Sequence, residues 1–220
     1  DFSYCFDTWS SQIADFCREV IKSPVLLIGN SIGGVIALRS SQMLADDCCG
    51  VVLIDCAQRT MDDKRLNEQP SWMRLARPSL KALVRQRWLS SNLFRNAAHP
   101  TVITKVLKQA YPSGANVDEQ LISLLHTPSK RPGAAEAFRG FINIFNDHLA
   151  PDLMSDMRVP VDLIWGEADP WEPLEVAQYW VESHPCIRSL EVISGVGHCP
   201  HDEAPEKVNP LLLRIIQQAI

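Results

Sequence analysis

The sequence predicts an α/β fold in which a parallel sheet is covered by helices on both faces and carries a long helical insertion. At both ends of the chain, short β-branched apolar runs alternate with amphipathic helical patterns, an order typical of a parallel sheet. Between residues 57 and 157 the alternation stops and only helical patterns occur. We therefore expect a sheet-forming core from residues 1–56 and 158–220, and a helical lid from residues 57–157. The 220 residues are enough for one domain with such an insertion.

Hydrophobic periodicity locates the elements of the core. Apolar side chains such as Trp9, Ile13 and Phe16 recur with the 3.6-residue period of a helix, which Pro24 would stop. Short continuous apolar runs indicate strands that are buried on both faces. The expected strands cover residues 25–28, 50–55, 159–165 and 190–194, and the expected helices cover residues 7–21, 32–44, 174–182 and 206–219.

Bulky apolar side chains dominate the helical patterns of the insertion. These patterns run over residues 72–94, 102–111, 117–125 and 134–146. An apolar, aromatic-rich lid would accept a hydrocarbon tail, because small-molecule sites are concave and mostly apolar. Bulky residues at helical spacing more often form the core of a lid than contact a ligand, so the pattern alone does not identify a substrate.

Composition and charge exclude some classes of protein. The net charge is −5 and no block of basic residues occurs, so we expect no nucleic-acid partner. The longest stretch without a charge, Ser23 to Leu38, is too short to span a bilayer. Seven cysteines without a C-x-x-C pair favour free, mostly buried thiols in a reducing compartment. A redox role for the vicinal pair Cys48 and Cys49 is the less favoured alternative.

A tight glycine-containing turn follows the first expected strand. Gly29 to Gly34 reads G-N-S-I-G-G and satisfies the G-x-S-x-G pattern, with a strand before it and a helix after it. In that context Ser31 would be a nucleophile above the sheet, and the Ile32 N–H at the helix N-terminus would face developing negative charge. The alternative is a phosphate-binding turn, but the glycine spacing of the dinucleotide and P-loop signatures is absent.

A serine nucleophile needs a base, and the base needs an acid that orients it. Asp169 follows the expected strand over residues 159–165, and His198 follows the strand over residues 190–194. The order Ser31, Asp169, His198 is the order Ser, acid, His that accompanies the G-x-S-x-G turn. The sequence therefore predicts a catalytic triad of these three residues.

Two alternatives compete with parts of this triad. Glu167 is the competing acid, but Pro170 fixes a turn that would aim Asp169 toward the sheet edge. His198 and His201 have a spacing that could suggest a metal site. Pro200 breaks any helix that would align them and no third ligand cluster is evident, so we expect no metal.

These motifs resemble the α/β-hydrolase superfamily, and longer runs narrow the resemblance. W-G-E-A-D-P-W-E-P over 165–173 and G-H-C-P-H-D-E-A-P-E-K-V-N-P-L over 197–211 resemble plastid chlorophyll dephytylases and, more distantly, pheophytinases. G-N-S-I-G-G and the opening F-D-T-W-S-S-Q-I-A-D-F-C are similar to the same group. The resemblance implies Ser31 as nucleophile, Asp169 as acid, His198 as base and Ile32 as an oxyanion donor. It further implies hydrolysis of a hydrophobic ester such as a phytyl ester, no cofactor, and a chloroplast location.

The chain departs from this family at its start. The family fold begins with several strands and with a loop whose N–H is the second oxyanion donor, and these would precede Asp1. We therefore expect an N-terminal piece of the same domain to be missing from this chain. The chain is then either a fragment or a shortened member with uncertain activity.

Other functions remain open on the sequence alone. The same triad could hydrolyse another ester, a lactone or a carbon–carbon bond, and a hydrolase fold could also act as a non-catalytic binding protein. Four basic residues at helical spacing, Arg74, Arg77, Lys81 and Arg85, would form a stripe suited to a peripheral contact with the thylakoid membrane. Pro78 interrupts that stretch, which favours a solvated helix face instead.

Overall fold

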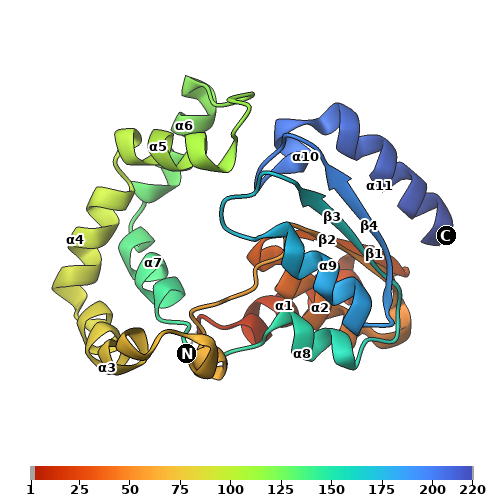
Figure 1. Ribbon diagram of the computed structural model, residues 1–220, viewed down its shortest axis with the longest axis horizontal. Helices are drawn as coiled ribbons and strands as arrows, with labels where there is room; N and C mark the ends of the chain where they lie inside the picture. The colour runs from red at the N-terminus through yellow and green to blue at the C-terminus, as the bar shows by residue number, and fades with distance from the viewer. Residues whose placement is uncertain (1–2, 220) are drawn as a thin grey trace. The chain divides into compact units, whose positions relative to one another are not determined.

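A four-stranded parallel sheet forms the centre of the larger of two units in the computed structural model, which describes residues 3–219. Its strands are β1 (Val25–Asn30), β2 (Cys48–Ile54), β3 (Val161–Gly166) and β4 (Ile187–Ile193), in the order β1-β2-β3-β4 (Figure 1). All neighbouring strands are parallel, and Asn30 lies opposite Ile54 while Ile54 lies opposite Ile164. The carboxyl ends of the four strands therefore meet at one edge of the sheet, as the predicted α/β fold requires.

Helices cover both faces of this sheet. One buried cluster joins the sheet to α11 (Pro205–Ala219) and includes Val52, Ile54, Ile164, Val208 and Ile215. On the opposite face Leu53 lies beside Gly34 of α2 (Ile32–Leu44). Trp165 packs edge-on against Trp180 of α9 (Leu174–Ser183), with ring centroids 5.9 Å apart. The strands are apolar on both faces because both faces are covered.

This unit contains five further helical segments among the described residues. They are α1 (Phe6–Phe16), a π-helix (Cys17–Ile21), a 3₁₀ turn (Ala45–Asp47), α8 (Ala150–Ser155) and α10 (Pro200–Glu203). The expected helix over residues 7–21 thus changes from α to π geometry in its last turn. Lys22 ends that turn in a left-handed conformation, and its N–H bonds the Cys17 carbonyl.

The other unit contains helices and loops but no strand among its described residues. It contains a 3₁₀ segment (Asp63–Glu68), α3 (Ser71–Arg85), α4 (Arg87–Ala97), α5 (Pro100–Ala110), α6 (Glu119–Ser129) and α7 (Ala134–Ile142), of which α5 ends in the larger unit. The pattern over residues 72–94 is two helices that meet at Gln86, whose backbone is extended. Pro78 lies inside α3 without ending it, contrary to the sequence interpretation, so the helix loses only the hydrogen bond that a Pro78 N–H would have made.

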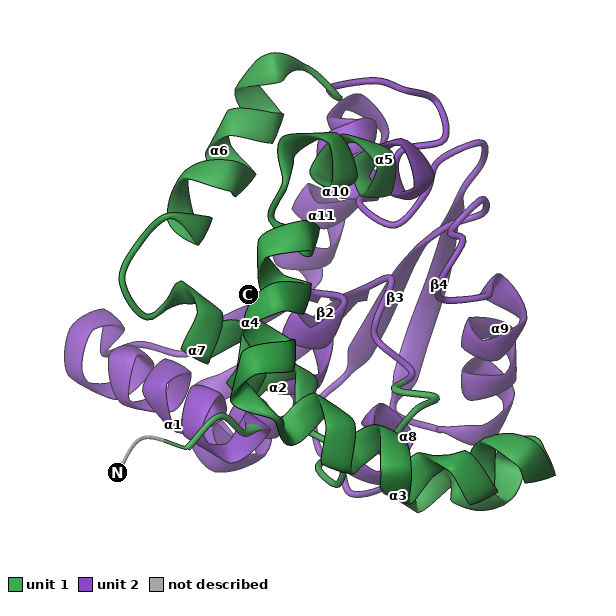
Figure 2. Ribbon diagram, turned by 90° about the vertical axis from the view of Figure 1, so that its left-hand side faces the viewer, with its two compact units in different colours: residues 1–5, 59–107, 117–147 green, residues 6–58, 108–116, 148–220 purple. Residues whose placement is uncertain are grey.

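The two units differ in their bounds from the expected core and insertion. Unit 1 comprises residues 1–5, 59–107 and 117–147, and unit 2 comprises residues 6–58, 108–116 and 148–220 (Figure 2). Residues 108–116 and 148–157, which we expected in the insertion, therefore belong with the sheet. Both segments bury apolar side chains, such as Tyr111 and Met154, and both are hydrogen-bonded to this unit: the His198 N–H donates to the Ala110 carbonyl at 2.9 Å, and the Gln42 amide donates to the Leu153 carbonyl at 3.1 Å.

Two further observations concern the cysteines and the lengths of the helices. All seven cysteines lie within the described residues and are free thiols. Across residues 3–219, every helix is too short or too polar to cross a membrane.

Candidate active site

Polar side chains follow the carboxyl end of every strand in the sheet. Ser31 comes directly after β1, Asp55 directly after β2, Asp169 three residues after β3, and His198 five residues after β4. Parallel strands place such residues at one edge, where open α/β sheets bind their ligands. A cleft of about 580 Å³ in unit 2 lies beside Cys48 and Val159 at the opposite edge.

Ser31 lies in a strained turn between β1 and α2. Its φ of 54° and ψ of −123° are unusual for a residue with a side chain, and its N–H donates to the Ile54 carbonyl at 3.0 Å. Its own carbonyl accepts the N–H groups of Gly34 and Ala57. The turn is so tight that a Cβ at Gly29 would lie 2.1 Å from the Gly33 carbonyl oxygen. Ile32 is the first residue of α2, which places its N–H at the helix N-terminus.

Asp169 and His198 form a direct, nearly buried pair. The Nδ1 atom of His198 lies 2.7 Å from Oδ2 of Asp169, and the two side chains are 9% and 0% exposed. An acid at Nδ1 holds the imidazole with Nε2 available to a hydroxyl. Among the described residues, Ser31 Oγ makes no hydrogen bond with His198. The structure thus joins two of the three predicted residues directly.

The loop after β3 fixes the orientation of Asp169. Its Oδ1 accepts the N–H groups of Trp171 at 2.8 Å and Glu172 at 3.2 Å, which forms an Asx turn around Pro170. Burial alone would raise the pKa of Asp169, but the hydrogen bonds from His198 and Trp171 outweigh it and hold the pKa below its ordinary value. The carboxylate therefore stays ionised beside the imidazole at neutral pH.

Glu167, the competing acid, makes different contacts. Its carboxylate accepts the Ser194 hydroxyl at 2.6 Å and the Gly195 N–H at 3.2 Å, and these hydrogen bonds lower its pKa. The residue is exposed at the end of β3. Glu167 therefore links the loops after β3 and β4, whereas Asp169 contacts His198.

Hydrogen bonds from three directions hold the His198 loop. The Asn30 amide donates to the His198 carbonyl at 2.9 Å, which connects this loop to the residue before Ser31. Glu203 is buried, and its carboxylate accepts the Gly197 N–H at 2.7 Å and the Ser113 N–H at 2.9 Å. The Trp171 ring also packs edge-on against the imidazole, with centroids 4.9 Å apart. The imidazole position is thus set by residues distant in sequence.

Asp55 was not among the sequence-predicted site residues. It is fully buried after β2 with a φ of 42°, and its Oδ1 accepts the Gly166 N–H at 2.9 Å. Its other oxygen has no hydrogen-bond partner among the described residues. Burial, with the nearby charges of Asp169 and Glu172, raises the pKa of Asp55 to about 10 against the Gly166 hydrogen bond. The sequence does contain a signal for Asp55: like Asp169, it is a carboxylate that follows a buried strand.

His, Cys, Asp and Glu side chains are the residues that could ligate a metal ion. Within residues 3–219, no three His, Cys, Asp or Glu side chains are grouped so that they could hold a metal ion. His201 is largely buried, and burial lowers its pKa.

The fold and this edge of the sheet define the class of protein. A family model described as the alpha/beta hydrolase family matches residues 2–211, and the chain belongs to that family. Chloroplastic pheophytinase from Arabidopsis thaliana is 27% identical over 230 residues, which cover 95% of this chain and 44% of the pheophytinase. The chain therefore spans less than half the length of that relative.

Solved structures show the same fold at lower sequence identity. An esterase from Exiguobacterium antarcticum superposes with a TM-score of 0.73 at 20% identity, covering 98% of this chain and 75% of the esterase. A thermophilic esterase from Thermogutta terrifontis gives a TM-score of 0.69 at 18% identity, covering 99% of this chain and 74% of that one. These likenesses bear on the fold, and the chemistry of this chain is argued from its own residues.

Proposed function

We propose that the chain is a serine hydrolase that cleaves a hydrophobic ester through Ser31, His198 and Asp169. The observation that carries the proposal is the 2.7 Å contact between His198 Nδ1 and the buried Asp169 carboxylate, at the edge of the sheet that holds the strained Ser31 turn. A buried acid and an imidazole have this relation when the imidazole serves as a base.

Acylation begins when His198 Nε2 takes the proton of the Ser31 hydroxyl. Ser31 Oγ then attacks the ester carbonyl carbon, and the negative charge that develops on the carbonyl oxygen is stabilised by the Ile32 N–H. His198 next gives its proton to the leaving alcohol as the carbon–oxygen bond breaks. Asp169 stays ionised throughout and stabilises the imidazolium that forms between these two transfers.

Deacylation repeats the sequence with water in place of the alcohol. His198 takes a proton from water, the resulting hydroxide attacks the acyl-enzyme carbonyl, and the proton returns to Ser31 Oγ as the acid leaves. The Ser31 hydroxyl must meet Nε2 for either half, and such hydrogen bonds often tighten only when substrate is bound.

The leaving group we propose is a long isoprenoid alcohol, such as the phytyl group of chlorophyll-type pigments. The similarity to a chloroplastic pheophytinase supports this choice and a chloroplast location. Other exposed apolar side chains of unit 1, including Trp88, Leu93 and Leu124, are of the kind that contacts a hydrocarbon tail.

Labelling with a fluorophosphonate probe tests the nucleophile. Such probes react with an activated serine, so the wild-type chain should label and Ser31→Ala should not. Ser183→Ala is a matched control, because that hydroxyl bonds the Tyr179 carbonyl on the surface of α9. Absence of labelling in the wild-type chain, with the fold intact by circular dichroism, would favour a non-catalytic binding protein.

A substrate panel tests the ester. We expect faster hydrolysis of pheophytin than of short nitrophenyl esters, lactones or substrates in which a carbon–carbon bond is cleaved. Preference for the short esters would remove the pigment assignment while leaving the serine hydrolase in place.

A further inference from the structure

Helix α3 exposes its apolar face and turns two of its four cations, Arg77 and Lys81, toward Asp63. Trp72, Leu75 and Leu83 share one side of the helix and are 68%, 84% and 50% exposed. Arg77, on the other side, is 4% exposed. A helix on a globular domain normally has the reverse arrangement, with its apolar stripe packed on the core.

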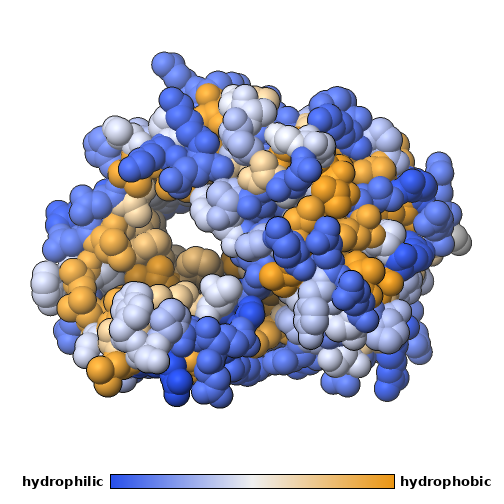
Figure 3. Space-filling model, in the orientation of Figure 1, coloured by the Kyte–Doolittle hydropathy of each residue, from blue (hydrophilic) through white to orange (hydrophobic). Residues whose placement is uncertain are grey.

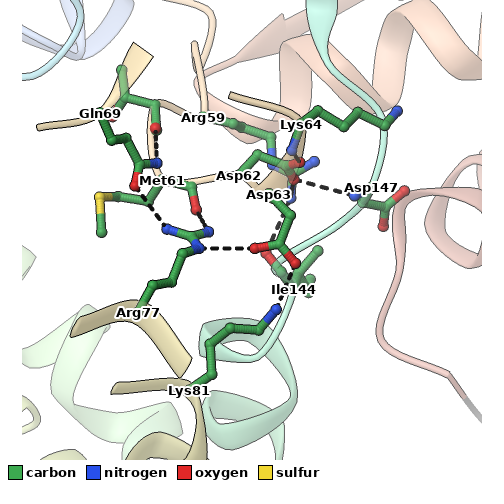
Figure 4. A network of polar contacts seen from close by, with 11 residues as sticks. Arg59, Met61, Asp62, Asp63, Lys64, Gln69, Arg77, Lys81, Ile144 and Asp147 are labelled. Atoms are coloured by element: carbon green, nitrogen blue, oxygen red, sulfur yellow. Dashed lines mark hydrogen bonds and ion pairs between the residues drawn. The ribbon is translucent and has the colours of Figure 1, made fainter. Parts of the chain in front are cut away.

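Asp63 explains the inward cations. Arg77 donates to its Oδ1 at 2.8 Å and Lys81 contacts its Oδ2 at 2.5 Å (Figure 4). Both cations also lie over the Phe145 ring. The four basic residues of α3 therefore do not form one surface stripe. Arg74 and Arg85 remain exposed, and neither makes an ion pair within the described part of the chain.

Charge is divided unequally between the two units. Unit 1 contains 13 lysines and arginines against 8 acidic residues, whereas unit 2 contains 8 against 18. No acidic residue occurs from Gln69 to Val117, a stretch that contains eight basic residues. In the view of Figure 3, hydrophobic side chains are exposed on the helical unit and also on the sheet unit, so the positive charge is the feature that distinguishes unit 1. Exposed apolar and cationic groups are thus combined on a unit of net charge +5, while the sheet unit carries −10.

We propose that α3 of unit 1 binds the surface of an anionic lipid bilayer, with its Trp72, Leu75 and Leu83 face in the interface. This inference does not depend on the proposed catalytic function. Interfacial helices combine an apolar face containing Trp and Leu with basic side chains, and α3 combines its exposed apolar face with the exposed Arg74 and Arg85. Arg74 and Arg85 are free to meet lipid phosphates, and each such charge favours binding to an anionic surface.

The opposite net charges of the two units favour an anionic bilayer over other binding partners for the apolar face of α3. An anionic surface attracts unit 1, which contains α3, and repels unit 2. An anionic bilayer also offers an apolar interior beneath its charge, which suits Trp and Leu side chains with cations behind them. A second copy of the chain is the competing occupant, and it is an outcome of the test.

Vesicle sedimentation of the whole chain tests the proposal. The wild-type protein should pellet with vesicles of equal parts phosphatidylglycerol and phosphatidylcholine, and much less with pure phosphatidylcholine or at high salt. Leu75→Glu should lower the partition coefficient about tenfold or more, because an apolar side chain no longer enters the interface. Leu213→Glu on α11 of unit 2 is the matched control, since Leu213 is 59% exposed, and should bind like the wild type.

A second variant separates charge from packing. Replacing Arg74 and Arg85 together by Gln should reduce binding to the anionic vesicles and leave the small binding to neutral vesicles unchanged. Ser31→Ala should bind like the wild type, so a failure of the catalytic proposal cannot be mistaken for a failure of this one. Equal loss in Leu75→Glu and Leu213→Glu, absence of wild-type binding, or a Leu75-dependent dimer without lipid would each overturn the proposal.

Discussion

The two acids after β3 differ in what they contact. Asp169 is bonded to His198, whereas Glu167 is bonded to Ser194 and Gly195. We expect Asp169→Asn to lower kcat about 10³- to 10⁴-fold, because an amide favours the wrong imidazole tautomer and does not stabilise the imidazolium. Glu167→Gln should stay within about twofold of the wild type. Hydrolysis of a nitrophenyl ester measures both, and similar losses in the two variants would reverse the assignment of the acid.

Asp55 should make folding stability depend on pH. Its pKa is about 10 in the folded chain and has an ordinary value of 3.8, so between these values the unfolded chain is ionised while the folded chain keeps the proton. The free energy of unfolding therefore falls as pH rises through this window, by up to about 1.4 kcal/mol per pH unit.

Asp55→Asn should remove that dependence. The amide oxygen can still accept the Gly166 N–H, and the amide does not titrate. We expect the variant to resemble the wild type near pH 5 and to exceed its unfolding free energy by more than about 1 kcal/mol near pH 8. Urea denaturation at both pH values measures the difference, and parallel curves for the two proteins would show that Asp55 is ionised in the folded chain.

Residues that follow strands could be predicted from the sequence, because a buried strand and its turn leave a local pattern. Ser31, Asp169 and His198 were found in this way, and their catalytic roles remain predictions. The support around them could not be found, since it depends on contacts between distant residues. Glu203 holds Ser113, 90 positions away, and Asp63 faces Arg77 and Lys81 across two helical segments. Ion pairs of this kind also decide which face of α3 packs inward. The hydrophobic pattern of the helix alone would predict that the apolar face packs inward.

The loop between β4 and α10 depends on one buried carboxylate. Glu203 accepts N–H groups from Gly197 and Ser113, and the Gly197 N–H immediately precedes His198 in the chain. Glu203→Ala should destabilise the chain by about 1–3 kcal/mol, because the buried Gly197 N–H loses its acceptor and the more exposed Ser113 N–H loses its partner. It should also lower kcat by about tenfold or more with a smaller change in KM, since the imidazole loses its fixed position.

A conservative change separates these two effects. Glu203→Gln keeps one acceptor oxygen and should recover part of both losses, whereas Glu206→Gln on the exposed side of α11 should change neither. A loss of stability in Glu203→Ala without a loss of kcat, measured where both proteins are fully folded, would mean that the loop does not position His198.

At the scale of the whole molecule, the two units are stabilised by different interactions. Nearly all of the buried hydrophobic residues belong to unit 2, and Leu107 is the only one in unit 1 among the described residues. Unit 1 instead contains a polar cluster in which Asp63 and Asp62 face Arg77, Lys81 and Arg59 (Figure 4). A unit with few buried apolar contacts belongs to the low-stability part of a fold. Local opening should therefore begin in unit 1.

Asp63→Ala tests this division of stability. The substitution leaves the buried Arg77 guanidinium with only the Gln69 side chain and the Met61 carbonyl, and we expect a loss of about 2 kcal/mol. Amide hydrogen exchange should accelerate about 30-fold over α3 and α4 and stay unchanged over β2 and β3. Glu136→Ala, which removes solvent-accessible ion pairs with Arg87 and Arg139, should alter exchange little. If exchange over β2 and β3 accelerates equally in Asp63→Ala, the units unfold together, and the polar cluster contributes to the stability of the whole chain.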